Sequence, residues 1–285
     1  IRDRLRSRGL GEVYKRQADR SVTVAEGQTL SLGSHTLQFF MAPMVHWPEV
    51  MVTYEQSEKI LFSADAFGKF GTLDTDEDWA CEARRYYFNI VGKYGMPAQA
   101  LLKKAAGLDI QKICALHGPI LTENLEYYIG KYQLWSTYTP EDEGIFIAYC
   151  SLHGNTEKAA KKLAEILEAK GAPKVAISDL SRDDMAECIE DAFRYDRLVL
   201  AAPTYDGGVM PVMADFINHL KMKAYQKRKV AFIENGSWAP MAAKLMKEQM
   251  SAMKDIEIVD EHVTIKSAFK QSDVAALEAL AGKLL

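Results

Sequence analysis

The residues best suited to bind a ligand lie in a short polar loop at 151–156. An apolar segment at 145–150 precedes this loop, and from Glu157 onward charged and apolar residues alternate with helical period. This pattern is typical of a buried parallel strand that turns into a helix. A phosphate at such a turn would meet free backbone N–H groups, the positive end of the helix dipole and the hydroxyls of Ser151 and Thr156. The loop therefore predicts an anion site.

Two later loops complement the first, at 202–208 and 235–238. Their glycines allow close backbone approach, and Tyr205 and Trp238 offer flat surfaces to a ring, although either could be a core aromatic. Ligands of doubly wound sheets bind beyond the carboxyl ends of the strands, so one shared site is expected. The candidate cofactor-binding residues are Ser151, Leu152, His153, Gly154, Asn155, Thr156, Pro203, Thr204, Tyr205, Asp206, Gly207, Gly208, Asn235, Gly236, Ser237 and Trp238.

Some of these residues have a second interpretation. A turn of Ser, Asn and Thr before a helix is also an ordinary N-cap. An exposed histidine in such a loop, as at position 153, either assists phosphate binding or has no role. Three such loops after three alternating units favour a binding site over coincidence.

A second candidate site is formed by His46, Asp65 and His117, each of which closes an apolar run. Imidazole and carboxylate groups at such positions could converge on metal, with the histidines as terminal ligands and the aspartate as a bridge. Taken singly, each residue fits an ordinary hydrogen-bonded loop position as well as it fits a metal ligand. The set is therefore more informative than its members.

The second half of the chain must position the three loops, and it alternates strictly between strand and helix patterns. Strands are expected at 145–150, 174–178, 197–202, 229–234 and 258–265, and helices near 156–170, 183–194, 211–223, 239–254 and 273–285. Five such units predict an α/β fold with a doubly wound, five-stranded parallel sheet covered on both faces.

The first half has a different pattern. Short alternating segments between 21 and 63 predict small antiparallel strands, and helices are expected at 77–94, 97–106 and 123–135, with a short strand at 113–116. The acidic segment around Pro140 predicts a linker. The division expected from the sequence is a non-native scar at 1–17, a first domain at 18–137, a linker at 138–143 and a second domain at 144–285.

Composition excludes several classes of protein. The net charge of -4 gives no electrostatic case for nucleic acid binding, and no apolar run is long enough to cross a bilayer. No signal-peptide pattern is seen, so a cytoplasmic location is expected. The four cysteines include no CxxC pair, which predicts buried free thiols and not a disulfide or zinc framework.

The three loops of the second half resemble those of flavodoxin domains. The loop at 151–156 matches the Ser/Thr-x-x-Gly-Asn-Thr phosphate loop of that family, and the loops at 202–208 and 235–238 match its isoalloxazine-binding loops. This resemblance implies FMN as the cofactor. No GxGxxG dinucleotide motif follows a strand.

Taken together, the motifs resemble the flavodiiron proteins, in which the later part of a metallo-β-lactamase-like αββα domain precedes a flavodoxin domain. The resemblance covers nearly all of 20–285 and implies that His46 and His117 ligate iron and that Asp65 bridges two irons. The family's earlier His-x-Glu-x-Asp-His stretch is absent from the printed sequence. The chain as written is therefore expected to begin partway through the metal domain, and to bind FMN but hold a diiron centre poorly.

The resemblance also implies an activity: electrons from FMN reduce dioxygen to water, nitric oxide to nitrous oxide, or both, at the diiron centre. The implied partners are rubredoxin or a flavin reductase as electron donor and a second copy in a head-to-tail homodimer, with Trp238 and Trp47 packed between the centres or else in the core. The alternative is a flavodoxin-like electron carrier without diiron catalysis, and a third interpretation is an FMN-binding module without turnover.

Overall fold

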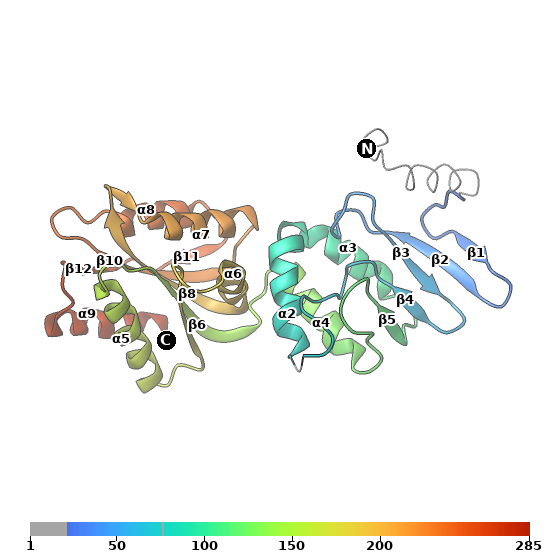
Figure 1. Ribbon diagram of the computed structural model, residues 1–285, viewed down its shortest axis with the longest axis horizontal. Helices are drawn as coiled ribbons and strands as arrows, with labels where there is room; N and C mark the ends of the chain where they lie inside the picture. The colour runs from blue at the N-terminus through green and yellow to red at the C-terminus, as the bar shows by residue number, and fades with distance from the viewer. Residues whose placement is uncertain (1–21, 76) are drawn as a thin grey trace.

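The computed structural model describes residues 22–75 and 77–285, so the expected scar at 1–17 lies outside the described residues. Two sheets lie at opposite ends of the molecule, with helices of both halves packed between them (Figure 1). The α/β fold class and the two-part architecture predicted from the sequence are confirmed.

The first sheet has five strands in the order β1-β2-β3-β4-β5. Its strands are β1 (Thr29–Ser31), β2 (Thr36–Met41), β3 (Met51–Glu55), β4 (Ile60–Phe62) and β5 (Lys112–Cys114). The first four pair in antiparallel fashion, as predicted, whereas β5 pairs parallel to β4. The first of the short alternating segments expected between 21 and 63, at 22–24, is not a strand, because β-branched residues favour a strand only where a partner strand is available.

The helices of the first half cover this sheet and meet the second half. They are α2 (Trp79–Tyr86), a π-helical turn (Tyr87–Val91), a 3₁₀ turn (Gly92–Tyr94), α3 (Gly95–Ala105) and α4 (Leu125–Ser136). The single helix expected at 77–94 is thus three consecutive segments with different hydrogen-bond periods. The spacing of apolar residues fits an α-helix, a π-helix or a 3₁₀ helix, so the sequence did not show that the helix type changes along this segment.

The second sheet follows the order β7-β6-β8-β10-β11, with all five strands parallel and β12 also paired to β10. Its strands are β6 (Asp142–Tyr149), β7 (Val175–Asp179), β8 (Tyr195–Tyr205), β9 (Gly208–Val209), β10 (Arg228–Asn235), β11 (Ile256–Ile258) and β12 (Val263–Ile265). The strand expected at 258–265 is therefore two short strands. Asp260, Glu261 and His262 are exposed between them, since three consecutive polar residues cannot be buried under helices.

Helices cover both faces of the second sheet, and the alternation of side chains along β6 shows how. Ile145 and Ile147 face a core shared with α5 (Asn155–Ala169) and α9 (Val274–Leu284), whereas Phe146 and Ala148 face α6 (Met185–Arg194), α7 (Pro211–Met222) and α8 (Ala242–Ser251). The boundaries of all five helices lie within three residues of those expected. None of the helices in the described part of the chain combines the length and apolarity needed to cross a bilayer.

The two halves share one continuous core. The rings of Phe88 and Phe193 stack with centroids 4.1 Å apart, and a buried ionic cluster lies beside them. In that cluster Arg84 of α2 pairs with Glu190 of α6 and, at 2.8 Å, with Glu141 ahead of β6. Ion pairs and apolar contacts therefore fix the sheet of the second half against the helices of the first.

Candidate functional site

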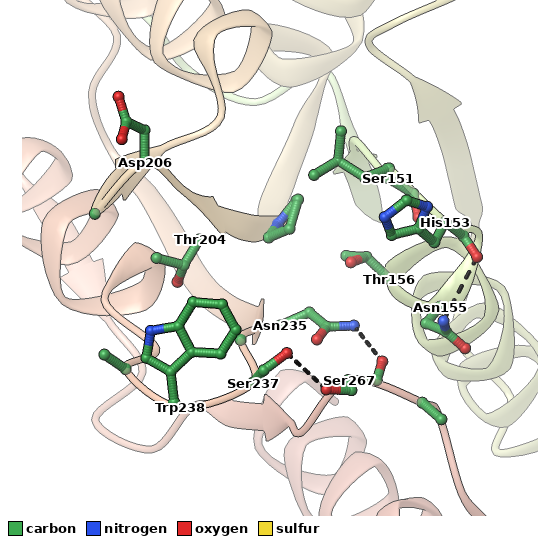
Figure 2. Close-up of a pocket in the computed structure, with 16 residues that line it drawn as sticks. Ser151, His153, Asn155, Thr156, Thr204, Asp206, Asn235, Ser237, Trp238 and Ser267 are labelled. Atoms are coloured by element: carbon green, nitrogen blue, oxygen red, sulfur yellow. Dashed lines mark hydrogen bonds between the residues drawn. The ribbon is translucent and has the colours of Figure 1, made fainter.

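A cavity of about 770 Å³ opens at the carboxyl ends of β6, β8 and β10 (Figure 2). Its volume lies within the range of roughly 300–1,000 Å³ that is usual for small-molecule sites. Fourteen of the sixteen residues that line it belong to the three loops or directly follow them, and the register of β8 with β10 pairs Pro203 with Asn235 and so brings two of these loops together. The structure therefore gathers the three predicted loops into one pocket.

The first loop presents unused hydrogen-bonding groups to this cavity. Gly154 adopts the left-handed conformation (φ 74°), and α5 begins directly after it. Thr156 is almost fully buried, and the buried hydroxyl of Ser151 has no hydrogen-bond partner among the described residues. Such an unpaired group is costly unless a ligand satisfies it. Together with the positive end of α5, the loop has the donors that a phosphate group requires.

The wall opposite this loop is built by side chains from β8 and β10. Thr204 Oγ1 accepts hydrogen bonds from the backbone N–H groups of Met241 (2.9 Å) and Ala242 (3.2 Å), which fixes the start of α8. Asn235 and Ser237 lie on the same wall (Figure 2). This wall leaves room for a flat ring between it and the first loop.

A fourth loop lines the cavity and was missed in the sequence. Ser267 and Ala268 follow β12, and the Ser267 hydroxyl lies 2.7 Å from that of Ser237 (Figure 2). Asn235 Nδ2 donates to the Ser267 carbonyl at 2.9 Å. The signal that could have identified this loop is its place after the last strand of the sheet, since ligands bind at that edge.

The two aromatic residues expected to face a ring are placed differently. Trp238 lines the rim of the cavity and is 91% exposed, whereas Tyr205 is 47% exposed and does not line it. Tyr205 pairs with Gly208 across a two-residue hairpin, whose Asp206-Gly207 turn has positive φ at both positions. Asp206 and Gly207 of this turn line the cavity, whereas Tyr205 and Gly208 are not among its lining residues.

The second candidate site lies where β2, β4 and β5 end. Asp65 follows β4 and His117 follows β5, and because these strands are parallel neighbours their following loops share one edge. The backbone N–H of Leu116 donates to the Ala64 carbonyl at 2.8 Å and ties the two loops together. His46 comes from the loop between β2 and β3. The three predicted metal ligands therefore meet, although they are up to 71 residues apart in the chain.

The geometry of these three side chains suits a bridging carboxylate. His46 Nε2 lies 3.2 Å from Oδ2 of Asp65, and His117 Nε2 lies 3.9 Å from Oδ1. Each imidazole therefore faces a different oxygen. His117 Nδ1 donates to the Lys69 carbonyl at 3.0 Å, which leaves its Nε2 lone pair free for a metal. The donor set matches two ions that share one aspartate.

Two neighbours that were not singled out in the sequence position His117. Gly68 lies so close that a Cβ atom there would be 2.4 to 2.9 Å from three atoms of the imidazole. The ring of Tyr86 packs edge-on against His117 with centroids 4.6 Å apart, and its buried hydroxyl has no hydrogen-bond partner within 22–75 and 77–285. Burial, together with the Asp65 charge, raises the pKa of Tyr86, which keeps the phenol protonated.

Among the described residues, a different set of three side chains lies close enough together to hold one metal ion. Cys81, Glu187 and Glu190 have ligand atoms within 4.8 Å of one another. Glu190 is already paired with Arg84, and Glu187 with Arg85 at 3.2 Å. Burial raises the pKa of the Cys81 thiol to about 11, so it is not a thiolate at neutral pH. This trio is therefore part of the ionic cluster between the halves. All four cysteines are free, as predicted, although Cys81 and Cys114 are only half-buried.

Comparison with known proteins agrees with this geometry. Residues 146–281 match the model of the flavodoxin domain, and residues 8–118 match that of the ODP family beta lactamase. The chain is 31% identical over 252 residues to a nitric oxide reductase of Moorella thermoacetica and 25% identical over 271 residues to a rubredoxin-oxygen oxidoreductase of Megalodesulfovibrio gigas. These alignments cover 84% and 90% of this chain, which spans 61% and 66% of the respective relatives.

The fold is shared with solved structures as well. The crystal structure of the flavodiiron protein from Giardia intestinalis superposes with a TM-score of 0.84 at 21% sequence identity, over 92% of this chain and 66% of that one. The order of the two matched domains is the order predicted from the motifs. With both domains and these relatives in agreement, the chain belongs to the flavodiiron protein family.

Proposed function

We propose that this chain binds FMN in the cavity at the carboxyl edge of its second sheet and that the flavin supplies electrons to a diiron centre that reduces dioxygen, nitric oxide or both. His46, Asp65 and His117 by themselves would hold that centre poorly, as the sequence indicated. The observation that carries the proposal is the coexistence of two built sites: a phosphate loop with an unpaired buried Ser151 hydroxyl, and two imidazoles that face the two oxygens of Asp65. FMN and a diiron centre are the cofactors of the family.

The residues suit these cofactors. The hydroxyl of Ser151, the backbone at the start of α5 and Thr156 would hold the phosphate, while Thr204, Asn235 and the fourth loop would hold the ring. His46, Asp65 and His117 would supply three of the metal ligands. When bound, the flavin accepts electrons and passes them on singly, and the metal pair binds the diatomic substrate. The chain itself orients both groups.

We propose the domain boundaries that the sequence indicated. Residues 18–137 form the metal-binding domain, 138–143 the linker and 144–285 the FMN-binding domain. Strand β6 already begins at Asp142, so the last residues of this linker also belong to the sheet. The match to the lactamase family begins at residue 8, inside the segment expected to be a scar.

We further propose that two copies associate head to tail. The five main strands of the second sheet run parallel, and β6 starts beside the helices of the first half (Figure 1). The flavin cavity lies at the opposite, carboxyl end of β6, and so away from the metal-binding half. Because β6 has eight residues, this places the two sites on the order of 25 Å apart or more. Apolar side chains are exposed near each site: Trp47 and Leu116 near the metal ligands and Trp238 at the flavin. Exposure of both tryptophans rules out the core interpretation, and a second copy would bring the two kinds of site together.

The electron donor is proposed to be a small redox protein such as rubredoxin, or a flavin reductase. The experiment that tests the function is anaerobic reduction of the FMN- and iron-loaded chain, followed by mixing with dioxygen or nitric oxide. Fast reoxidation coupled to loss of the gas supports the proposal. Slow reoxidation of flavin alone would instead assign the chain to the electron carriers, and absence of bound flavin would reject both.

A further inference from the structure

A groove of about 370 Å³ lies between the two halves, on the side of the second sheet opposite the flavin cavity. One wall comes from the π-helical and 3₁₀ turns of the first half, including Phe88 and Lys93, and the other from the end of α7, including Met222 and Lys223. His46 also lines the groove. The groove is therefore separate from the FMN pocket but adjacent to a candidate metal ligand.

Two ammonium groups in this groove lack a counterion. Neither Lys93 nor Lys223 has a carboxylate of the described residues within 4.0 Å. Lys223 Nζ donates to the Asn89 carbonyl at 2.9 Å, which uses one of its three donors. Half-burial, with the Lys93 charge as the second cause, lowers the pKa of Lys223, and no acidic group opposes this shift. A half-buried cation next to a like charge is unfavourable unless an anion neutralises it.

The remaining charged groups around the groove do not supply that anion. His219 lines the groove and lies 3.7 Å from Asp215, one helical turn earlier on α7, but Asp215 is not a lining residue. None of the lining residues is acidic. The backbones of the two halves approach each other closely at this groove. A Cβ atom added at Gly92 would lie only 3.3 Å from Cβ of Lys223. The two lysines are therefore carried by closely apposed backbone segments and line one space.

We propose that this groove binds a small oxyanion, inorganic or carboxylate, between Lys93 of the first half and Lys223 of the second. The volume is at the lower end of the usual range for ligand sites, which excludes a nucleotide. Phe88, Ile90 and Met222 provide an apolar wall beside the cations. Because the two lysines belong to different halves, a bound anion links the halves and stiffens the region next to His46.

The test uses inorganic phosphate as the probe and the chain saturated with FMN, so that the phosphate loop is filled. A chelator is included so that phosphate does not bind through a metal. Calorimetric titration of wild type is compared with Lys223→Met and Lys93→Met, which keep most of the side-chain length, and with Lys221→Met as control. Lys221 is exposed on the same helix and does not line the groove.

We expect each of the two groove variants to weaken phosphate binding roughly tenfold or more, the scale of one lost charge-assisted hydrogen bond. The Lys221→Met chain should bind like wild type. Unchanged binding in both groove variants, or no saturable binding by wild type, would overturn the proposal. So would a loss of self-association in Lys223→Met without any phosphate binding, because the anion would then be a carboxylate of a second copy. Lys93 is exposed, so its variant remains informative even if Lys223→Met unfolds.

Discussion

His46 and Asp65 form a histidine–carboxylate pair in which Nε2 and Oδ2 lie 3.2 Å apart. A second pair, His35 Nδ1 and Glu55 Oε1, has the same separation of 3.2 Å. The difference lies in their surroundings. Asp65 presents its other oxygen to His117, whereas both oxygens of Glu55 accept backbone N–H groups, from Ser57 and Glu58. Only the first pair is therefore arranged to share a carboxylate between two ions.

This comparison gives a matched prediction for metal binding. His46→Gln should lower the iron content of the chain severalfold after identical loading, because one ligand of the proposed centre is lost. His35→Gln, which breaks the other pair, should retain the iron content of wild type. Metal analysis after gel filtration measures both. Equal iron in the two variants would show that His46 is an ordinary loop histidine.

Gly68 provides a second test of the same site without touching a ligand. In Gly68→Ala the new methyl group would lie within 2.9 Å of the His117 ring, so the imidazole must move. Iron affinity should fall by about tenfold or more, while FMN affinity stays unchanged. Gly130→Ala is the control, because that position in α4 is open to solvent and the substitution should stabilise the fold by about 0.5–1 kcal/mol. Unaltered iron binding in Gly68→Ala would contradict the placement of His117.

The substitution Ser151→Ala should weaken FMN binding without lowering the stability of the flavin-free protein. Removing the hydroxyl should weaken FMN binding by roughly five- to a hundredfold, the effect of about 1–3 kcal/mol. The flavin-free protein should be no less stable than wild type, since the Ser151 hydroxyl has no partner in the part of the chain that the structure describes. Flavin fluorescence titration and urea unfolding measure the two quantities. Ser181→Ala, at an exposed loop position, should change neither. A flavin-free variant that is clearly destabilised would assign the hydroxyl a structural role.

The ionic cluster between the halves predicts a pH dependence of stability. Burial raises the pKa of Glu190 to about 7, from the usual 4.5, despite the adjacent Arg84. Between about pH 4.5 and 7, the Glu190 carboxyl is therefore protonated in the folded chain and ionised in the unfolded chain. The contribution of Glu190 to the free energy of unfolding therefore falls as the pH rises from about 4.5 to about 7.

The variant Glu190→Gln should flatten that part of the pH profile, measured by urea unfolding at several pH values. Glu168→Gln, an exposed substitution on α5, is the control. Glu141 acts in the opposite sense: burial favours a higher pKa, but Arg84 and Lys131 outweigh it and lower the pKa. The stability due to Glu141 is lost only as the pH falls below about 4.5. A profile of Glu190→Gln that parallels wild type between pH 4.5 and 7 would exclude Glu190 as the responsible group.

The sequence was most informative where its patterns were longest. Each helix of the second half has a clear apolar face, so all five were predicted to within three residues, and the loops between them could be assigned to one edge of the sheet. The three predicted metal ligands were singled out because each closes an apolar run, and the structure brings their side chains together. Loops after parallel strands converge by topology, and this step needs no knowledge of packing.

What the sequence did not reveal depends on contacts between distant segments. Ser267 lines the flavin cavity because β11 and β12 replace one long strand, a break caused by exposed polar residues at 260–262. Tyr86 was expected only as part of a helix face, and its contact with His117 depends on how α2 packs against the first sheet. The hairpin that holds Tyr205 was also not expected from the sequence. Tertiary packing decided each of these cases.

The central claim is that the cavity at the carboxyl edge of the second sheet is an FMN site whose phosphate end is the 151–156 loop. Titration of the flavin-free chain with FMN and with riboflavin, which lacks the phosphate, tests it most directly. The account predicts stoichiometric FMN binding, with riboflavin weaker by roughly a hundredfold or more, because two or more charge-assisted hydrogen bonds are lost. Equal affinity for the two flavins, or no binding of FMN, would contradict it.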